Sequence, residues 1–263
     1  MALFELSSDD PPPLQHWREN GAANVILACD HASNRVPRAL AGLGLGATEL
    51  ERHIAWDIGA AEVTRRLAVL LDAPAILAGY SRLVIDCNRG LDDASSIPET
   101  SDGVAIPGNR AITRSERGAR QEQIFAPYHA ALERSIAARI ALGRVPAFLS
   151  IHSFTPVMGG KARPWHVGIL WDGDPRIPQP LLAALRADAA LVVGDNEPYS
   201  AREPQGYTVR THAVQRGLPH VAIELRQDLI ADDAGAARWA GILRAALAPI
   251  LARADLYRVR GGG

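Results

Sequence analysis

The sequence predicts an α/β fold in which helices cover a mostly parallel β-sheet. Short apolar runs rich in β-branched residues alternate along the chain with longer stretches of helical periodicity, a pattern typical of β–α–β units. With 263 residues, 48% of them hydrophobic, the chain can also bury a substantial core. We therefore expect a single domain over residues 1–263.

Six apolar runs are predicted to be strands because each has the length and composition of a buried strand. The first of them ends abruptly at the polar pair Asp30-His31. The predicted strands are residues 24–29, 75–79, 82–87, 147–151, 165–171 and 220–225.

Three stretches are predicted to be helices. The first begins at a capping box formed by Thr48 and Glu51, and apolar residues then recur at helical spacing to about Leu71. The second is expected over about 115–142 and the third over about 232–252.

The segment 90–113 is rich in Gly, Pro, Ser and Asp and is too long for a plain connection. Long loops in compact domains often serve as lids or binding loops. The two ends of the chain, residues 1–20 and 258–263, are expected to be loose because of their proline and glycine runs.

Composition and charge exclude several classes of function. The net charge of −1 provides no basic field for nucleic acid or for an anionic membrane. The first residues lack the pattern of a signal peptide, and no run of about 18 apolar residues is present to span a membrane. Cys29 and Cys87 form neither a disulfide framework nor a CxxC metal motif. We expect a cytoplasmic enzyme with a small-molecule substrate, either monomeric or homodimeric.

Polar side chains cluster where the predicted strands end. In open α/β sheets, ligands bind outside the carboxyl ends of the strands, so these side chains are expected to share one site. The clustered residues are Asp30, His31, Asp86, Asn88, Arg89, His152, Ser153, Glu224 and Arg226.

The residue types at this edge favour a metal-dependent hydrolase. The sequence contains no GxSxG nucleophile elbow and no glycine-rich phosphate loop that follows a strand. Two histidines and a carboxylate are common ligands of a catalytic zinc ion, which lowers the pKa of a coordinated water to about 7. A nearby carboxylate can then take the proton as the water attacks a carbonyl. We expect one divalent metal ion, with Zn²⁺ first and manganese, cobalt or iron as alternatives.

Two residues of the first predicted helix are candidates to complete the site. His53 and Asp57 are four residues apart, so they would lie on one face of that helix. Asp57 is the candidate third metal ligand. His53 either supports the site or forms a buried hydrogen bond with Asp57 that orients the helix.

Six motifs are spread along the chain from about residue 24 to 230: DHASNRVP, HIAWDIGA, SRLVIDCNR, IHSFTP, RPWHVGILWD and IELRQDL. Together they resemble the N-formylglutamate amidohydrolase family, and SRLVIDCNR is the most specific of them. The resemblance implies hydrolysis of an N-formyl amide to formate and a free amino acid, in amino-acid catabolism. It also implies a fold similar to that of the zinc carboxypeptidases, a three-layer α/β/α arrangement in which helices sandwich a mixed, mostly parallel sheet.

The resemblance implies roles for individual residues. His31 and His152 match the two histidine ligands of the carboxypeptidases. Glu224 is placed like their general base, and Arg82 corresponds to the arginine that polarises the carbonyl. On this basis Glu224 and Arg82 are the candidate catalytic residues.

The pair Asn88-Arg89 matches the carboxylate-binding Asn-Arg of those peptidases. Arg89 can also grip a carboxylate with two parallel charge-assisted hydrogen bonds, which supports the same role on chemical grounds. One departure concerns Asn34, which stands where the carboxypeptidases have a glutamate ligand. An amide cannot supply an anionic ligand, so the third ligand is expected to be Asp57. The chain resembles a divergent branch of the family, and its substrate need not be formylglutamate itself.

Further residues are expected to surround the metal and the substrate clamp. Asp86 is expected to orient Arg82 or Arg89, whereas His166 and His212 either support the site or belong to the core. The supporting residues are Asp30, His53, Asp86, Ser153, His166, His212 and Arg226.

The predicted function is metal-dependent hydrolysis of an N-formyl or other N-acyl amino acid. One alternative is a binding or sensor protein for a small carboxylate that has lost catalysis. Another is a carboxypeptidase-like deacylase of a different N-acyl amino acid. Glu224 distinguishes enzyme from binder, because a protein that only binds has no use for a base at a strand end.

Overall fold

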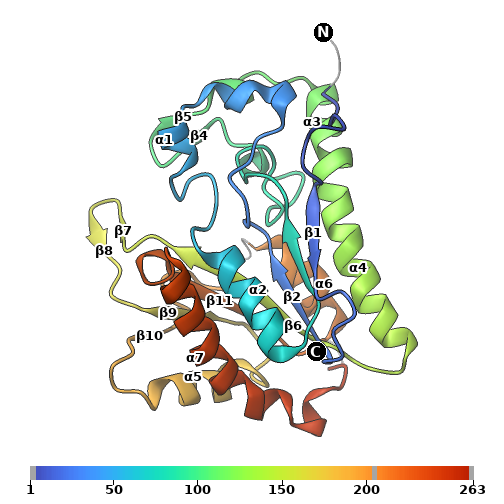
Figure 1. Ribbon diagram of the computed structural model, residues 1–263, viewed down its shortest axis with the longest axis vertical. Helices are drawn as coiled ribbons and strands as arrows, with labels where there is room; N and C mark the ends of the chain where they lie inside the picture. Colours follow the sequence, from blue (N-terminus) through green and yellow to red (C-terminus); the bar gives the residue numbers. More distant parts are fainter. Residues whose placement is uncertain (1–3, 203–205, 261–263) are drawn as a thin grey trace.

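One mixed sheet of seven strands organises the described residues, which are 4–202 and 206–260 of the computed structural model (Figure 1). Its strands are β1 (Leu14–Trp17), β2 (Val25–Cys29), β3 (Ala75–Ala78), β6 (Ala147–Phe154), β9 (Val167–Leu170), β10 (Val193–Asp195) and β11 (His220–Arg226). Their order is β1-β3-β2-β6-β11-β9-β10. The pairs β1–β3 and β9–β11 are antiparallel and the other neighbours are parallel, so the predicted mostly parallel, mixed sheet is confirmed.

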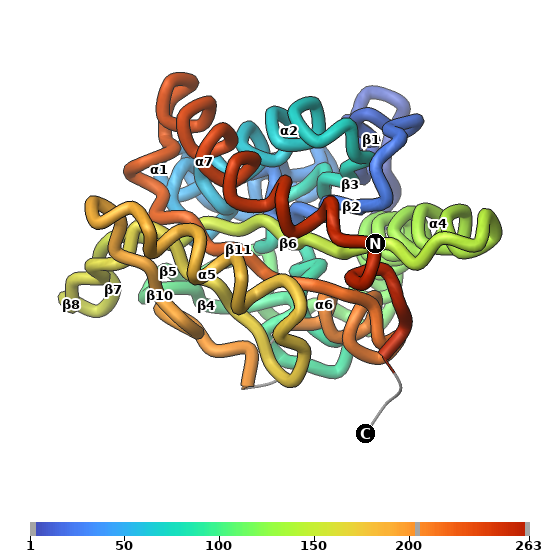
Figure 2. The backbone as a smooth tube through the Cα atoms, turned by 90° about the horizontal axis from the view of Figure 1, so that it is seen from below, coloured from blue at the N-terminus to red at the C-terminus, as the bar shows by residue number. Residues whose placement is uncertain are grey.

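Helices cover both faces of this sheet. The helices are α1 (Ala47–Leu50), α2 (Ala60–Leu71), α3 (Arg114–Arg120), α4 (Ala126–Ala141), α5 (Pro178–Arg186), α6 (Tyr207–His212) and α7 (Asp233–Leu251). Short 3₁₀ turns are Arg38–Gly44, Ala94–Ser96, Pro107–Asn109, Val214–Arg216, Gln227–Leu229 and Ala254–Leu256, and residues Gln121–Phe125 form a π-helical turn. Figure 2 shows α2 and α7 on one side of the central strands and α6 on the other.

The alternation of side chains along β2 produces the three layers. Val25, Leu27 and Cys29 pack into one apolar cluster with α2, α5 and α7. Ile26 and Ala28 point the other way, into a second cluster with α4. Because successive side chains of a strand face opposite sides, a wholly apolar strand needs cover on both faces. The predicted three-layer α/β/α class is confirmed.

The predicted strand 82–87 is wrong. Leu83, Val84 and Ile85 are buried in a third apolar cluster, but none of them belongs to a strand. The carbonyl groups of Leu83 and Val84 accept hydrogen bonds from side chains and not from a neighbouring strand. Asn109 Nδ2 donates to the carbonyl of Leu83 at 2.8 Å, and Arg120 Nη1 donates to that of Val84 at 3.0 Å. An apolar run predicts burial, and the hydrogen-bond partners decide the conformation.

The predicted helix from Thr48 to Leu71 is interrupted. Helix α1 ends at Leu50, α2 starts at Ala60, and turns occupy the residues between them. Gly59 has a φ of +80°, and a Cβ there would lie 2.1 Å from the carbonyl oxygen of Ile230. Only glycine fits this left-handed position, and the helix therefore cannot run through it. As a consequence, His53 and Asp57 do not share a helix face.

The other two predicted helices are confirmed. Residues 114–141 are continuously helical, with the π-helical turn at their centre, and α7 covers the third prediction. The elements β1, β10, α5 and α6 were not predicted. They are three to nine residues long, too short for a clear periodicity.

The expectation of loose ends is wrong for parts of both termini. Residues 14–17 pair with β3, and the backbone N–H of Arg260 donates to the carbonyl of Gly217 at 2.9 Å. Residues 1–3 and 261–263 lie outside the described ranges. None of the helices in the described part of the chain has the length and apolar character needed to cross a membrane.

The segment 90–113 contains a small hairpin of β4 (Thr100–Ser101) and β5 (Val104–Ala105). A second hairpin, β7 (Val157–Met158) and β8 (Lys161–Ala162), follows β6. Both hairpins lie toward the same side of the molecule as the end of β10 (Figure 1).

Candidate active site and metal centre

A cavity of about 920 Å³ lies at the carboxyl ends of β2, β6 and β11. The loop 90–113 contributes to its wall through Ser95, Pro98 and residues 100–102. The sequence-predicted residues that line it are His31, His53, Asp57, Arg82, Asp86, Asn88, Arg89, His152, Ser153 and Glu224. Residues from distant parts of the chain therefore meet at the edge of the sheet where ligands bind in α/β folds.

His31 is the second residue after the end of β2, where the chain leaves the sheet. It is 3% exposed. A hydrogen bond joins its Nε2 to Asp86 Oδ1 at 2.7 Å, and its Nδ1 lies 3.4 Å from Asp57 Oδ2. The ring is thus fixed from both nitrogens, with Nδ1 facing Asp57.

His152 is carried by β6 and has a similar environment. Its Nδ1 is hydrogen-bonded to Asp57 Oδ2 at 2.9 Å. Its Nε2 lies 2.9 Å from Ser150 Oγ and 3.2 Å from Asp30 Oδ2. Ser150 and His152 are two residues apart in one strand and so point to the same face.

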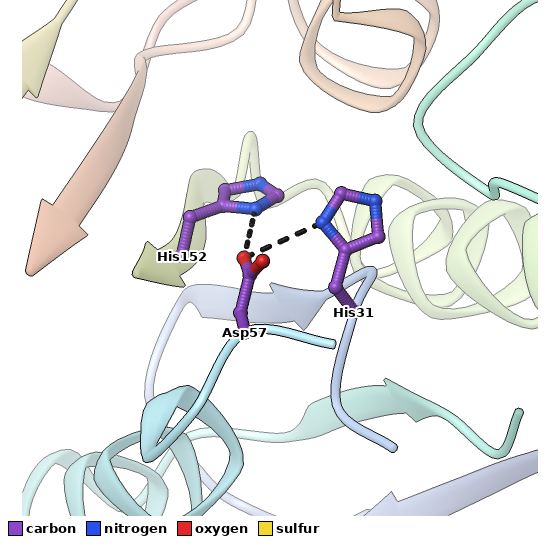
Figure 3. A group of neighbouring side chains, drawn as sticks. All are labelled: His31, Asp57 and His152. Carbon is purple, nitrogen blue, oxygen red and sulfur yellow. Dashed lines mark hydrogen bonds and ion pairs between the residues drawn. The ribbon is translucent and has the colours of Figure 1, made fainter. Parts of the chain in front are cut away.

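Asp57 brings the two histidines together (Figure 3). Its backbone N–H donates to the carbonyl of His31 at 2.9 Å, which fixes the turn before α2 against the end of β2. Its Oδ2 also accepts a hydrogen bond from the backbone N–H of Ser153 at 3.2 Å. The Ser153 hydroxyl donates to the carbonyl of Ile58 at 2.8 Å, so Ser153 holds this turn in place.

The three side chains have the arrangement of a metal-ligand set. One donor atom from each of His31, Asp57 and His152 lies within 4.8 Å of the others, and all three residues are buried. The outer nitrogens of the histidines, their Nε2 atoms, contact the carboxylates of Asp86 (from His31) and Asp30 (from His152). Such carboxylate–histidine contacts orient the imidazoles of metal sites and increase their basicity. The residues present therefore fit a divalent cation.

Charge is tightly balanced around this group. Burial alone would raise the pKa of Asp30, but hydrogen bonds from His152 and Thr208 and the charges of the two histidines hold it at about 2. The same histidines hold the pKa of Asp57 far below its ordinary value against the effect of burial. In return, these carboxylates raise the pKa of His152 well above its ordinary value. The carboxylates remain charged at neutral pH, and positive charge is favoured between them.

Glu224 lies beside His152 because the two residues are register partners in the parallel pair β11–β6. Its side chain is buried, and Oε2 has no hydrogen-bond partner among the described residues. Burial raises the pKa of Glu224 to about 7; the charge of His152 opposes this rise and that of Asp57 adds to it. A carboxylate with a pKa near neutrality suits a group that exchanges protons during turnover.

Arg82 lies next to the metal-ligand set and contacts two of the carboxylates. Its Nε and Nη2 donate to Asp86 Oδ2 at 3.1 and 2.7 Å. Its Nη1 lies 3.7 Å from Asp57 Oδ1. The guanidinium therefore supports Asp86, which in turn holds His31.

The pair Asn88-Arg89 lies on the cavity wall beyond Asp86. Asp86 Oδ1 accepts from the backbone N–H of Asn88 at 2.8 Å. Asn88 Oδ1 accepts from the backbone N–H of Thr208 at 3.0 Å and so holds the first turn of α6. Arg89 Nη1 donates to the carbonyl of Asn88 at 3.0 Å.

Four residues proposed from the sequence lie apart from the metal-ligand set. His53 lines the cavity, but its Nε2 lies 3.4 Å from Asp102 Oδ2. Among the described residues it forms no hydrogen bond with Asp57. His212 pairs with His129 at 2.9 Å, His166 Nδ1 accepts from the backbone of Val192, and Arg226 binds Asp228. Neither His166, His212 nor Arg226 is among the residues that line the cavity.

Sequence reasoning missed the residues that hold Asp30. The hydroxyls of Tyr128 and Thr208 both donate to Asp30 Oδ1 at 2.7 Å. They come from α4 and α6, where no strand-end pattern points to them. Ser150 is different, because its spacing of two from His152 is a signal that the sequence contains. Tyr199, which lines the cavity from the loop after β10, was also missed.

A sequence profile of the N-formylglutamate amidohydrolase family matches residues 23–231. The chain belongs to this family. Membership supports a hydrolase of amide bonds and agrees with the resemblance seen in the six sequence motifs.

Two solved structures have a similar fold. A gene product of Agrobacterium tumefaciens is 37% identical with a TM-score of 0.90, and the match covers 94% of this chain and 97% of that one. The N-formylglutamate amidohydrolase of Ralstonia eutropha is 18% identical with a TM-score of 0.66, over 92% of this chain and 97% of that one. At this lower identity the similarity shows a shared fold. No curated protein sequence matches the chain significantly.

Proposed function

We propose that this protein is a metal-dependent amidohydrolase that cleaves an N-acyl amino acid, with N-formylglutamate as the first substrate to test. The observation that carries the proposal is the buried His31–Asp57–His152 group with Glu224 beside it in one cavity. Family membership supports the same class of reaction.

The ligands of the metal would be the Nδ1 atoms of His31 and His152 and the Oδ2 atom of Asp57. Two imidazoles and one carboxylate leave an open position in a four-coordinate zinc site, which favours Zn²⁺. When bound, the divalent ion supplies the Lewis acidity that activates a water and a carbonyl group. Asp86 and Asp30 hold the outer nitrogens of the imidazoles in that orientation.

Glu224 would act as the general base. Its unpartnered Oε2 can accept the proton of the attacking water, and a pKa of about 7 then allows it to pass this proton to the leaving nitrogen. The remaining N–H groups of Arg82 can point at the carbonyl oxygen.

Asn88 and Arg89 would bind the carboxylate of the substrate. A guanidinium binds a carboxylate through two parallel hydrogen bonds, which fixes the amide relative to the metal. We also expect the enzyme to act as a single domain in the cytoplasm, where the buried thiols of Cys29 and Cys87 would stay reduced.

The alternative of a carboxylate-binding or sensor protein is disfavoured by Glu224. A further buried carboxylate beside Asp30, Asp57 and Asp86 repels an anionic ligand, so a protein that only binds carboxylates gains nothing from it. An enzyme that must move a proton, in contrast, needs such a carboxylate as a base.

The test begins with metal analysis of protein purified without added metal. We expect about one divalent ion per chain. Hydrolysis is then measured for N-formylglutamate, N-acetylglutamate and the α-amide of each, by detection of the released amine. A protein without metal that hydrolyses none of these after metal addition would overturn the proposal.

A further inference from the structure

Tyr199 is a partly exposed residue on the wall of the candidate-site cavity. It belongs to the loop that follows β10, and its side chain lines the same cavity as Glu224 and the metal-ligand set.

Arg163, which directly follows β8, holds the Tyr199 side chain. Its Nη1 donates to the Tyr199 hydroxyl at 3.0 Å, and its guanidinium carbon lies 4.8 Å from the centre of the tyrosine ring. The same carbon lies 6.0 Å from the ring of Phe154, at the end of β6. Contacts of this kind between a guanidinium and aromatic faces are favourable, so Arg163 joins the hairpin to the loop.

The direction of this hydrogen bond determines what the hydroxyl can do. A guanidinium only donates, so the tyrosine oxygen accepts and keeps its own proton for another acceptor. Within the described ranges no protein acceptor for that proton lies at hydrogen-bonding distance. Tyr199 lines the cavity and is 39% exposed, so the proton of this hydroxyl is available to a ligand bound there.

Tyr199 stays protonated at neutral pH, because partial burial raises the pKa of its hydroxyl and the negative charge of Glu224 adds to the rise, whereas Arg163 lowers it. Tyr199 and Arg82 line the same cavity as Glu224 and Asp57, which they reach from distant parts of the chain.

We propose that Tyr199 is a catalytic hydrogen-bond donor that stabilises the negative charge developing on the acyl oxygen of the substrate, and that Arg163 positions it. The hydroxyl donates a hydrogen bond and does not lose its proton, so no further reactant is needed. This inference rests on the proposed amidohydrolase function. Donors aimed at a developing oxyanion act most strongly when they are held in place before the reaction, and the Arg163 contact provides this.

The first test compares Tyr199→Phe with wild type on whichever N-acyl glutamate the wild type hydrolyses. We expect kcat to fall about 10- to 100-fold, with KM and metal content nearly unchanged, because the bond is strongest in the transition state. Tyr257→Phe is the matched control, since that hydroxyl also makes one hydrogen bond, to the carbonyl of Leu251, and Tyr257 does not line the cavity. A variant with unchanged kcat, or with only a raised KM, would overturn the assignment.

The second test does not depend on activity. The ultraviolet titration of wild type minus that of Tyr199→Phe isolates the ionisation of Tyr199. In an Arg163→Gln background this ionisation should move to higher pH, and kcat should fall with it. An unmoved titration would overturn the positioning role of Arg163. If wild type hydrolyses no substrate, the proposed function fails, whereas an active wild type with a fully active Tyr199→Phe rejects only the present inference.

Discussion

Replacing Glu224 with glutamine should lower turnover and, in the metal-free protein, raise the free energy of unfolding, so the two roles of this residue can be measured separately. The side chain is 8% exposed, and its Oε2 has no partner among the described residues. Glutamine has nearly the same shape but cannot take a proton from water. We expect turnover to fall by about 10²- to 10⁴-fold, the usual contribution of a positioned proton-transfer group. Metal content and substrate affinity should stay close to those of wild type.

The same substitution should stabilise the metal-free protein at neutral and alkaline pH. A carboxyl group whose pKa rises on folding costs stability as the pH rises above its ordinary value of 4.5, and the cost is complete above about 7. A rise from 4.5 to about 7 corresponds to about 3 kcal/mol, because a tenfold change in a proton equilibrium is about 1.4 kcal/mol. The variant should therefore gain up to about 3 kcal/mol in free energy of unfolding at pH 8 and much less at pH 4.

Urea unfolding of chelator-treated protein between pH 4 and 8 measures this difference. Hydrolysis by the metal-loaded protein measures turnover. Glu122→Gln is the matched control, because Glu122 is exposed on the π-helical turn and should change neither quantity. Full turnover in Glu224→Gln would refute the role of the base. A stability difference that does not grow with pH would refute the reasoning from burial.

Three further predictions concern the metal ligands, the substrate clamp and a buried histidine pair. Alanine at His31 or His152 should abolish stoichiometric metal binding while the far-ultraviolet circular dichroism stays native, and full metal occupancy in both variants would exclude the site. Arg89→Lys should hydrolyse the free-acid substrate at least about 30-fold more slowly than wild type, because an ammonium cannot form the two parallel hydrogen bonds of a guanidinium. Equal rates of the wild type on the acid and on its α-amide would refute the role of Arg89 in binding the carboxylate. Burial lowers the pKa of His212 from its ordinary value of 6.5 to about 4. The unfolded chain therefore binds a proton more readily, and the free energy of unfolding should fall by up to about 3 kcal/mol as the pH falls from about 6.5 to 4. His212→Gln should lack this component in acid unfolding measured beside wild type, and identical pH profiles would contradict it.

Residues at the strand ends were predictable because their signal is local. An apolar run followed at once by a charged or imidazole side chain marks the place where a buried strand reaches the surface, as at Cys29-Asp30-His31. His152 and Glu224 also come directly after apolar runs. They lie side by side because β6 and β11 are neighbouring strands in which these two residues are register partners. The family motifs span these same positions.

Asp57 was predicted to lie at the site from a helical spacing that the structure contradicts. The predicted helix placed it beside His53, whereas the structure places it in a turn whose backbone binds that of His31. Helix α2 starts only after Gly59, which has a left-handed backbone and packs against the carbonyl of Ile230, 171 residues further along the chain. Helical periodicity in the sequence does not indicate that contact.

By itself, therefore, the sequence determined the α/β class, the family and the set of side chains that reach the carboxyl edge of the sheet, since each depends on neighbouring residues or on a contiguous motif. Tertiary structure alone decided that 82–87 is no strand and that His166, His212 and Arg226 lie away from the cavity. It also brought Arg163 into contact with Tyr199 on the cavity wall, although the two residues are 36 positions apart in the sequence. Those outcomes depend on which distant groups satisfy a buried carbonyl or hold a side chain. Such partners are chosen only when the whole chain has folded.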